Sequence, residues 1–293
     1  MENTKATPFF VWIGGKRKLL KQISDHYPQE LIQGKIKNYI EPFVGGGAVF
    51  FDIMQKYNIE NSILIDINPN IINAYKQVKE NPERLVNELK TIENRYNNLP
   101  NMEIKGLFYY AIRKTFNIKK QSKVLQAAHF IFLCKTFFNG VYRVNKKSEL
   151  NTPFGQKVKI KLFSEENIYN CSNLLKNTNL ICGDYKECEW YVTDHTFLYF
   201  DSPYRPTEKS GYIKYSADPF TDIDQIELSD LFDRVTEKNA LAMLSNSSTE
   251  DGFFEKIYNE YSFHQLDVHR CVSGDIKYRK AVSELLITNF TKR

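Results

Sequence analysis

The chain has 293 residues, of which 42% are hydrophobic and 14% aromatic, and its formal net charge is +5. This length and apolar content exclude a disordered segment and indicate a globular protein with one large domain, or one domain that carries a sizeable insertion. The five cysteines lack a C-x-x-C pair, which excludes a disulfide framework or zinc cluster, and no leader or membrane-length apolar run is present, so we expect a soluble protein of the reducing cytoplasm.

The first feature in chain order is an apolar stretch at residues 9–13 that ends in a basic glycine turn at residues 14–18. A helix should follow before Pro28. Taken alone, Trp12 and Lys16 would be interpreted as a core aromatic residue and a surface lysine.

Residues 39–47 are expected to form a short strand that ends in a glycine turn, with a helix at residues 48–57 after it. Three consecutive glycines let the backbone turn tightly and let a ligand approach the N–H groups at a helix start. A strand at residues 62–65 ends at Asp66, nineteen residues beyond Gly47, where an acid can bind ribose hydroxyls. No Gly-x-Gly-x-x-Gly or Gly-Lys-Ser/Thr motif is present, so a nucleoside without a pyrophosphate fits better than a dinucleotide or ATP.

Helices are expected at residues 69–79, 85–96, 106–116 and 122–138, and their apolar stripes indicate core packing. Residues 103–160 contain twelve Lys or Arg and two acids, whereas the remainder of the chain contains 28 Lys or Arg and 33 acids. Such a run is usually a solvated face, but one set between acidic flanks also fits a subdomain that binds a polyanion. After Asn139-Gly140, residues 141–148 should form a basic β-hairpin, which either enters the major groove of DNA or lies on the surface with solvated lysines.

The alternation of helices and strands resumes with a helix at residues 164–176 and a strand at 179–182 that leads to Asp184. A buried strand at residues 197–200 then runs into the sequence Asp201-Ser202-Pro203-Tyr204. Ligands of open α/β sheets bind beyond the carboxyl ends of strands, so Asp201 should lie at a pocket mouth, although Asp-Ser-Pro is also common in ordinary turns.

The last part of the chain should contain a helix at residues 223–238, a strand at 240–244 and two closing strands at 263–269 and 282–290. A basic loop joins the closing strands and contains Arg270, Lys277, Arg279 and Lys280. The five histidines have neither metal-ligand spacing nor a catalytic partner, so we expect structural roles for them and no metal site.

The order of these motifs resembles that of the Dam-type DNA adenine N6-methyltransferases, the D12-class or class alpha N6-adenine methyltransferases. In that family a Gly-rich motif comes first, then a recognition segment and then a D-P-P-Y motif, and the resemblance extends over nearly the whole chain. The stretches that carry it are Trp12-Ile13-Gly14-Gly15-Lys16, Glu41-Pro42-Phe43-Val44-Gly45-Gly46-Gly47, Asp66, Asn139-Gly140-Val141-Tyr142-Arg143, Asn151-Thr152-Pro153-Phe154-Gly155, Asp201-Ser202-Pro203-Tyr204 and Ser283-Glu284-Leu285-Leu286-Ile287.

The resemblance implies an α/β fold in which a Rossmann-like methyltransferase sheet, residues 1–70 and 160–293, carries an inserted, mostly helical target-recognition domain with a β-hairpin, residues 71–159. The implied cofactor is S-adenosyl-L-methionine, bound by Trp12, Lys16, Glu41, Pro42, Phe43, Gly45, Gly46, Gly47, Asp66, Asp184 and Asp201. The implied partner is duplex DNA, bound by Asn139, Val141, Arg143, Lys146, Lys147 and Pro153. The implied catalytic residues are Asp201, Ser202, Pro203 and Tyr204.

By the same resemblance, a target adenine in a short site such as GATC leaves the duplex and stacks on Tyr204. Its amino group would donate to the Asp201 carboxylate and to the carbonyl of Ser202. Two fixed acceptors favour the pyramidal, nucleophilic form of an amine whose lone pair is otherwise delocalised. A restriction–modification system with a cognate endonuclease, and a monomer or weak dimer, are compatible with this resemblance.

Two residues depart from the family pattern. Ser202 replaces the first proline of D-P-P-Y; the carbonyl is kept, so activity should be kept, with some loss of loop rigidity. Val11 stands where related enzymes often have a lysine that contacts the outer guanine of GATC, which leaves the first base of the site open, whereas Arg143 still suits a guanine. The alternatives are an N4-cytosine or RNA N6-adenine methyltransferase, and a catalytically silent DNA-binding module.

Overall fold

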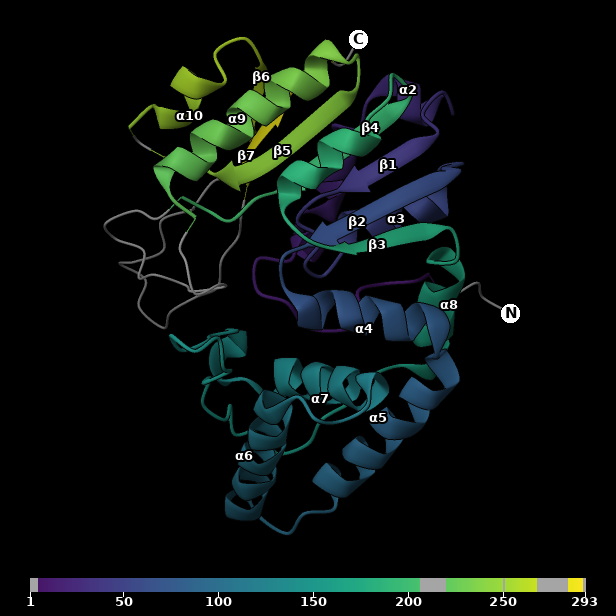
Figure 1. Cartoon of the computed structure of the whole chain (residues 1–293), viewed down its shortest axis with the longest axis vertical. Coiled ribbons are helices and arrows are strands. Elements are labelled where there is room, and N and C mark those ends of the chain that lie inside the picture. Colours follow the sequence, from purple (N-terminus) through teal and green to yellow (C-terminus); the bar gives the residue numbers. More distant parts are fainter. Residues whose placement is uncertain (1–4, 206–219, 250, 268–283, 292–293) are drawn as a thin grey trace.

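The structure is a computed structural model that describes residues 5–205, 220–249, 251–267 and 284–291. Within these residues, seven strands form one sheet in the order β3-β2-β1-β4-β5-β7-β6 (Figure 1). β7 runs antiparallel between β5 and β6, and the other neighbouring strands are parallel. The strands are β1 (Asn38–Glu41), β2 (Asn61–Asp66), β3 (Thr178–Cys182), β4 (Thr196–Asp201), β5 (Leu241–Ser247), β6 (Ser262–Leu266) and β7 (Glu284–Thr288).

The central strand β4 separates two hydrophobic cores. Phe197 and Tyr199 belong to one core and Leu198 and Phe200 to the other, because successive side chains of a strand point to opposite faces of the sheet. All four side chains are fully buried, so both faces of the sheet must be covered by helices. The predicted α/β fold with a mostly parallel sheet is confirmed.

Several helices begin at residues whose side chains cap the first turn. The side chains of Asn68, Asn101, Ser122 and Ser164 each accept a hydrogen bond from a backbone N–H two or three residues later. The helices are η1 (Lys16–Lys18), α1 (Leu20–Ser24), α2 (Gln29–Ile32), α3 (Ala48–Lys56), α4 (Pro69–Glu80), α5 (Pro82–Asn97), α6 (Met102–Ile118), α7 (Lys123–Thr136), η2 (Phe138–Gly140), α8 (Glu165–Leu174), η3 (Tyr185–Tyr191), α9 (Asp222–Glu237) and α10 (Phe253–Ile257).

The helices divide between the sheet and a separate layer. α3, α4 and α8 contribute to the core that contains Phe197, whereas η3, α9 and α10 contribute to the core that contains Phe200. α5, α6 and α7 lie beyond α4, away from the sheet, and α7 packs against α4, α5 and α6 (Figure 1). α7 is therefore buried along most of its length, which confirms the prediction that its apolar residues are core.

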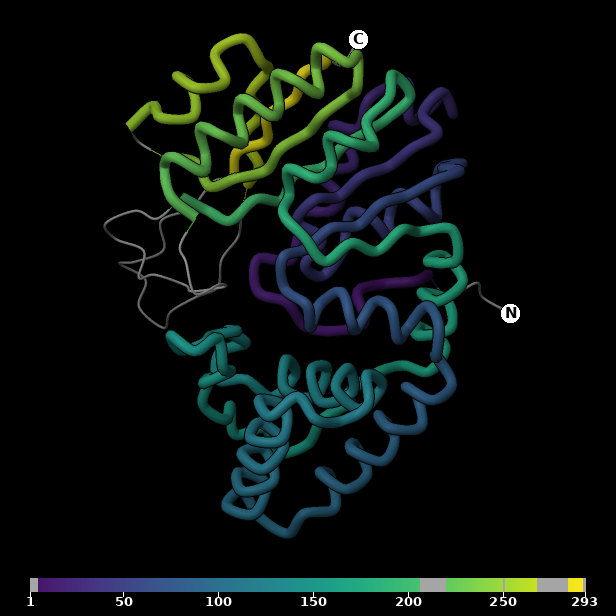
Figure 2. Tube along the Cα trace, viewed as in Figure 1, coloured from purple at the N-terminus to yellow at the C-terminus, as the bar shows by residue number. Residues whose placement is uncertain are grey.

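The basic hairpin expected at residues 141–148 differs from the prediction. In residues 137–155, all of which the structure describes, the chain does turn back on itself, but the pairs Val144–Leu150 and Phe137–Phe154 are isolated β-bridges rather than strands. The antiparallel path is held instead by hydrogen bonds from Asn145 N to Glu149 O and from Asn151 N to Arg143 O, both 2.9 Å long. Figure 2 shows this teal segment on the side of the molecule where the parallel strands end.

Short elements account for most of the other differences. The sequence pattern missed α2, η3 and α10, which are too short to show a periodic pattern. The closing strands are shorter than expected, and the basic loop with Arg270, Lys277, Arg279 and Lys280 lies outside the described residues. No helix within the described parts is long and apolar enough to cross a membrane.

Candidate active site

Three acidic residues of the predicted site lie at the carboxyl ends of neighbouring strands. Glu41 ends β1, Asp66 ends β2 and Asp201 ends β4. β1 pairs with β2 on one side and with β4 on the other, so the order of the strands reverses between β1 and β4. The crevice at such a reversal is where open α/β sheets bind ligands.

Lys16 extends from η1 into this crevice, and the interpretation as a surface lysine is wrong, because only 3% of Lys16 is exposed. Its ammonium Nζ lies 2.5 Å from Asp201 Oδ1 and 3.3 Å from Glu284 Oε1. It also donates to the Tyr204 hydroxyl at 3.1 Å and to the Gly14 carbonyl at 3.2 Å. The Lys16 ammonium thus joins the first glycine turn, the motif after β4 and the start of β7.

Burial and charge act in opposite directions on this cluster. Burial raises the pKa of Asp201, and the Lys16 ammonium partly counteracts this rise. Burial lowers the pKa of Lys16, but Asp201 and Glu284 outweigh it, so Lys16 stays charged. Burial also raises the pKa of Glu284 to about 7, despite the opposing effect of Lys16. The cluster therefore changes its charge near neutral pH through Glu284.

Glu41 is the most deeply buried acid of the edge, with 2% of its surface exposed. The Tyr39 hydroxyl donates a 2.6 Å hydrogen bond to Glu41 Oε2. Burial raises the pKa of Glu41 to about 8, while the Tyr39 bond lowers it and the nearby Asp201 adds to the rise. Glu41 is therefore protonated at neutral pH in the absence of a bound cation.

The glycine turn depends on residues that a side chain would disrupt. Gly45 and Gly47 have left-handed backbone angles, with φ of 45° and 66°. A Cβ atom on Gly47 would collide with the Tyr75 hydroxyl, which itself donates to the Gly45 carbonyl at 3.3 Å. A Cβ atom on Gly45 would lie 3.0 Å from Trp12 Cδ1, so Trp12 packs directly on the turn.

Asp66 links the glycine turn to the end of β2. Its Oδ2 accepts from Gly45 N at 3.0 Å and its Oδ1 accepts from Asn68 N at 2.8 Å. Burial raises the pKa of Asp66 to about 6, and these two hydrogen bonds limit the rise. Each carboxylate oxygen has a second lone pair, so Asp66 can still accept from a ligand hydroxyl.

Phe43 and Asp184 lie on the η3 side of the edge. The Phe43 ring stacks on Tyr185 with centroids 5.0 Å apart. Asp184 caps η3, because its carboxylate accepts from Lys186 N at 2.9 Å, while Asp184 N donates to Glu187 Oε1 at 3.0 Å. Asp184 is exposed, and its neighbour Gly183 donates its N–H to the Asp66 carbonyl. Asp184 therefore lies near Asp66 and can face a ligand that Asp66 binds.

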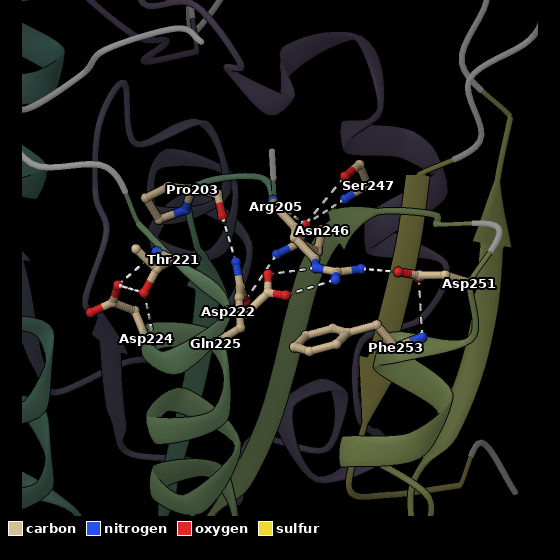
Figure 3. A network of polar contacts seen from close by, with 10 residues as sticks. All are labelled: Pro203, Arg205, Thr221, Asp222, Asp224, Gln225, Asn246, Ser247, Asp251 and Phe253. Carbon is tan, nitrogen blue, oxygen red and sulfur yellow. Dashed lines mark hydrogen bonds and ion pairs between the residues drawn. The ribbon is translucent and has the colours of Figure 1, made fainter. Parts of the chain in front are cut away.

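The loop after β4 is fixed by polar side chains from α9 and β5. Ser202 is 1% exposed, and its hydroxyl accepts from Asn246 Nδ2 at 3.0 Å. Gln225 Nε2 donates to the Pro203 carbonyl at 2.9 Å (Figure 3). A proline at position 202 could not accept the Asn246 bond, so the hydroxyl offsets the loss of rigidity that the sequence predicts.

Arg205 fixes the next part of this loop, although no sequence motif points to it. The Arg205 guanidinium forms a two-pronged ion pair with Asp222, at 2.6 and 2.7 Å, and a second ion pair with Asp251 (Figure 3). It also lies over the Phe253 ring, 4.0 Å from the centroid. Arg205 thereby ties the residue after Tyr204 to the start of α9 and to the turn before α10.

The predicted DNA-binding residues lie together on the turn segment 137–155. Asn139, Arg143, Lys146, Lys147 and Pro153 are exposed, and Val141 is half-buried. Asn139 has a left-handed backbone, with φ of 53°. The segment is anchored from behind, because the Thr152 carbonyl accepts from the Tyr109 hydroxyl at 2.7 Å and from Arg113 Nη1 at 2.8 Å.

Arg143 is held by its neighbour Asn151. Arg143 Nε donates to Asn151 Oδ1 at 2.9 Å and Nη2 to the Asn151 carbonyl at 3.4 Å. One edge of the guanidinium is therefore occupied, and the remaining N–H groups stay available. Next to it, the ring of Tyr142 packs against Trp12 with centroids 5.2 Å apart, which brings the turn segment to the cofactor side of the predicted site.

Within the described residues, no group of three or more His, Cys, Asp or Glu side chains could hold a metal ion. A family model described as D12 class N6 adenine-specific DNA methyltransferase matches residues 12–272 of the chain.

The chain is also similar over nearly its whole length to curated proteins. It is 42% identical over 288 residues to the type II methyltransferase M.MjaIII of Methanocaldococcus jannaschii, and the aligned region covers 97% of this chain and 99% of that protein. It is 32% identical over 286 residues to the DNA adenine methylase of Haemophilus influenzae, covering 96% and 93%. It is 29% identical over 283 residues to the DNA adenine methylase of Escherichia coli strain K12, covering 96% and 95%.

Proposed function

Since the chain belongs to the D12 class N6 adenine-specific DNA methyltransferases and is an adenine-specific DNA methyltransferase, we propose that its methyl donor is S-adenosyl-L-methionine and its target an adenine in a short duplex site, GATC or a related sequence. One observation carries the proposal. The Asp201 carboxylate lies at the reversal of strand order, held by Lys16 beside the Tyr204 ring. This arrangement offers an acceptor and an aromatic face to one planar base with an amino group.

The residues along the edge of the sheet fit the cofactor. Asp66 and Asp184 can accept from ribose hydroxyls, and Trp12, packed on Gly45, and Phe43 offer apolar surface. Lys16, Pro42, Gly46 and Gly47 complete the proposed cofactor site. The buried Glu41 and the half-buried Asp201 favour a cationic ligand, because desolvation raises the pKa of each acid and a positive charge would lower the cost of ionising them.

The bound cofactor supplies an electrophilic methyl group on a sulfonium. The chain's own residues orient the nucleophile. Asp201 and the Ser202 carbonyl each accept a hydrogen bond from one N–H of the adenine amine, which frees the nitrogen lone pair for attack. Pro203, held through its carbonyl by Gln225, fixes the direction of the Ser202 carbonyl, and Tyr204 stacks on the base. In this transfer the bond between the methyl group and the sulfur would break, and the cofactor would leave as its neutral thioether. The amine nitrogen would carry a positive charge until it releases a proton to water, and the half-buried carboxylate of Asp201 is placed to stabilise that charge.

We assign residues 1–70 and 160–293 to a catalytic domain and residues 71–159 to a target-recognition domain. α5, α6 and α7 lie beyond α4, away from the sheet (Figure 1), which supports this division, whereas α4 itself contributes to the core that contains Phe197. Asn139, Val141, Arg143, Lys146, Lys147 and Pro153 would contact the DNA. Arg143 can read a guanine through its free N–H groups, whereas Lys146 and Lys147 suit phosphates.

The proposal extends to the cellular setting. The name of the relative from Methanocaldococcus jannaschii, a type II methyltransferase, supports a restriction–modification role with a cognate endonuclease. We propose that the protein acts in the cytoplasm, on duplex DNA, as a monomer or weak dimer.

The test is transfer of a tritiated methyl group from S-adenosylmethionine to duplex DNA, followed by digestion to nucleosides. The expected product is N6-methyladenine in duplex DNA. Label on cytosine, or on RNA alone, would contradict the proposal, and no transfer would favour a silent DNA-binding module.

A further inference from the structure

The ammonium of Lys16 has more acceptors than hydrogens. Among the described residues, four oxygens lie within 3.3 Å of Nζ, belonging to Asp201, Glu284, Tyr204 and Gly14. An ammonium donates three hydrogen bonds. If a ligand replaced Lys16 as the partner of Asp201 Oδ1, Lys16 would keep three acceptors, one of which, the Glu284 carboxylate, would be its counter-ion.

Glu284 has no other polar partner among the described residues. It is 4% exposed, and its Oε2 is buried without a hydrogen-bond partner there. An ionised carboxylate in such a place costs stability unless it is paired and fully hydrogen-bonded. A leucine or glutamine at position 284 would pack in the strand with a smaller desolvation cost. The carboxylate of Glu284 is therefore better explained by a function than by a contribution to stability.

The sheet places Glu284 on the same face as Asp201, with β5 between the two strands. Asp201 pairs with Ser245 of β5, and two residues further along β5, Ser247 pairs with Glu284 of β7. With Glu284 ionised, Lys16 and the two carboxylates carry a net charge of −1. Without Glu284, Lys16 and Asp201 would cancel.

We propose that Glu284 is a positioning residue that serves as the counter-ion of Lys16 and leaves the charge of Asp201 in excess, so that the site prefers a positively charged methyl donor and stabilises the positive charge that develops on the target amine. The inference rests on the proposed function, since it takes the donor and the amine to bind at Asp201. Glu284 acts through Lys16 and touches neither ligand.

The test compares two ligands that differ at the sulfur. S-adenosylmethionine carries a sulfonium charge, whereas S-adenosylhomocysteine lacks both that charge and the methyl group. Titration calorimetry without DNA at about pH 8.5, above the pKa of about 7 of Glu284, gives the ratio of their affinities. Glu284→Gln removes the charge and keeps the shape. The substitution should lower the preference for S-adenosylmethionine over S-adenosylhomocysteine by roughly tenfold, which is the effect expected when one nearby charge is removed from a partly buried site.

Two variants serve as controls. Glu60→Gln removes the same charge from an exposed position just before β2, at the opposite end of the sheet, and should leave the ratio unchanged. Glu284→Asp keeps the charge on a shorter side chain and should restore most of the preference. Thermal unfolding of each variant checks that the fold is kept.

The outcomes separate the two proposals. Glu284→Gln with an unchanged ratio, or with equal losses for both ligands, would overturn the role of Glu284 and leave the proposed function standing. Failure of the unaltered protein to bind either ligand would overturn both. In the presence of DNA, single-turnover methylation by Glu284→Gln should also be slower by roughly tenfold.

Discussion

The buried Lys16 ammonium and the half-buried Asp201 carboxylate form an ion pair, with Nζ 2.5 Å from Oδ1. The pair joins the glycine turn at the start of the chain to the motif after β4. Because Lys16 opposes the rise in the pKa of Asp201 that burial causes, Asp201 can remain an acceptor at neutral pH. The same ammonium lies 4.9 Å from the centroid of the Tyr204 ring, where the target base is proposed to stack.

Asp201→Ala should abolish most methyl transfer, because the amine loses one of its two acceptors. Loss of one preorganised partner costs on the order of 3–4 kcal/mol in the barrier, or about 10²–10³-fold in rate. The fold should persist, since Lys16 keeps Glu284 as its counter-ion. Single-turnover rates at saturating cofactor check the prediction, with circular dichroism as the control for folding. A variant with most of the original rate would exclude Asp201 as the amine acceptor.

Arg205→Ala should slow methylation more than it weakens cofactor binding. The substitution removes two ion pairs and the contact with Phe253, so the loop that carries Tyr204 loses one of its attachments to α9, while the Gln225–Pro203 bond remains. After discounting for the exposure of both acids, the loss of unfolding free energy should be about 1–2 kcal/mol. Arg205→Lys is the matched control; it keeps the charge but cannot form the two-pronged pair with Asp222, so it should recover only part of the rate. Equal effects on cofactor affinity and rate would show that Arg205 supports the whole edge rather than the loop.

Glu41 should make the fold less stable as the pH rises. Its pKa is raised from 4.5 to about 8 on folding, so the unfolded chain releases the proton near pH 4.5 and the folded chain keeps it until about pH 8. The unfolding free energy therefore falls across this window, by up to a few kcal/mol, and levels off above it. Glu41→Gln mimics the protonated acid and keeps the bond with Tyr39, so it should flatten this dependence. Denaturant unfolding of both proteins between pH 5 and about pH 9 decides the point; parallel curves would mean that Glu41 is not the group that titrates.

Arg143 and Lys146 should affect DNA binding in different ways. Arg143→Ala should cost roughly 1–3 kcal/mol and relax the preference at one base pair, because a guanidinium can bind both acceptors of a guanine. Lys146→Ala should weaken binding to all sequences alike and lower the salt slope by about 1. Asn151→Ala removes the hydrogen bond from Arg143 Nε to Asn151 Oδ1, and so tests whether that bond orients the Arg143 guanidinium toward the base. Titrations against a cognate duplex and its single substitutions at several salt concentrations measure all three; equal losses for Arg143→Ala on every duplex would make it a backbone contact.

The parts of the fold that the sequence predicted are those encoded locally. The buried strand before Asp201 shows as an apolar run, and the glycine turn shows as three adjacent glycines. The buried state of Lys16 could not be predicted from its neighbours, because its partner Tyr204 lies 188 residues further along the chain. Arg205 likewise depends on Asp251, 46 residues away. Only the family resemblance points to Glu284, and its contact with Lys16 follows from the arrangement of the strands.

The basic hairpin illustrates a different limit. The pattern predicts a break at Asn139-Gly140 and a two-stranded ribbon at residues 141–148; the break is present, as the short helix η2, but the ribbon is reduced to isolated bridges. Besides its few backbone hydrogen bonds, the segment is held by side chains: Asn117 Nδ2 donates to the Leu150 carbonyl at 3.0 Å, and Leu150 N donates to Asn117 Oδ1 at 2.9 Å. Such side-chain substitutes for strand pairing leave no periodic pattern in the sequence.

The most direct measurement is the identity and position of the methylated base. DNA from cells that express the chain, and duplex DNA treated with the purified protein, would be sequenced with detection of modified bases, with Asp201→Ala as the inactive control. The account predicts N6-methyladenine at one short recurring site in both samples and none with the variant. Methylation confined to cytosine, or adenine methylation that persists with Asp201→Ala, would contradict it.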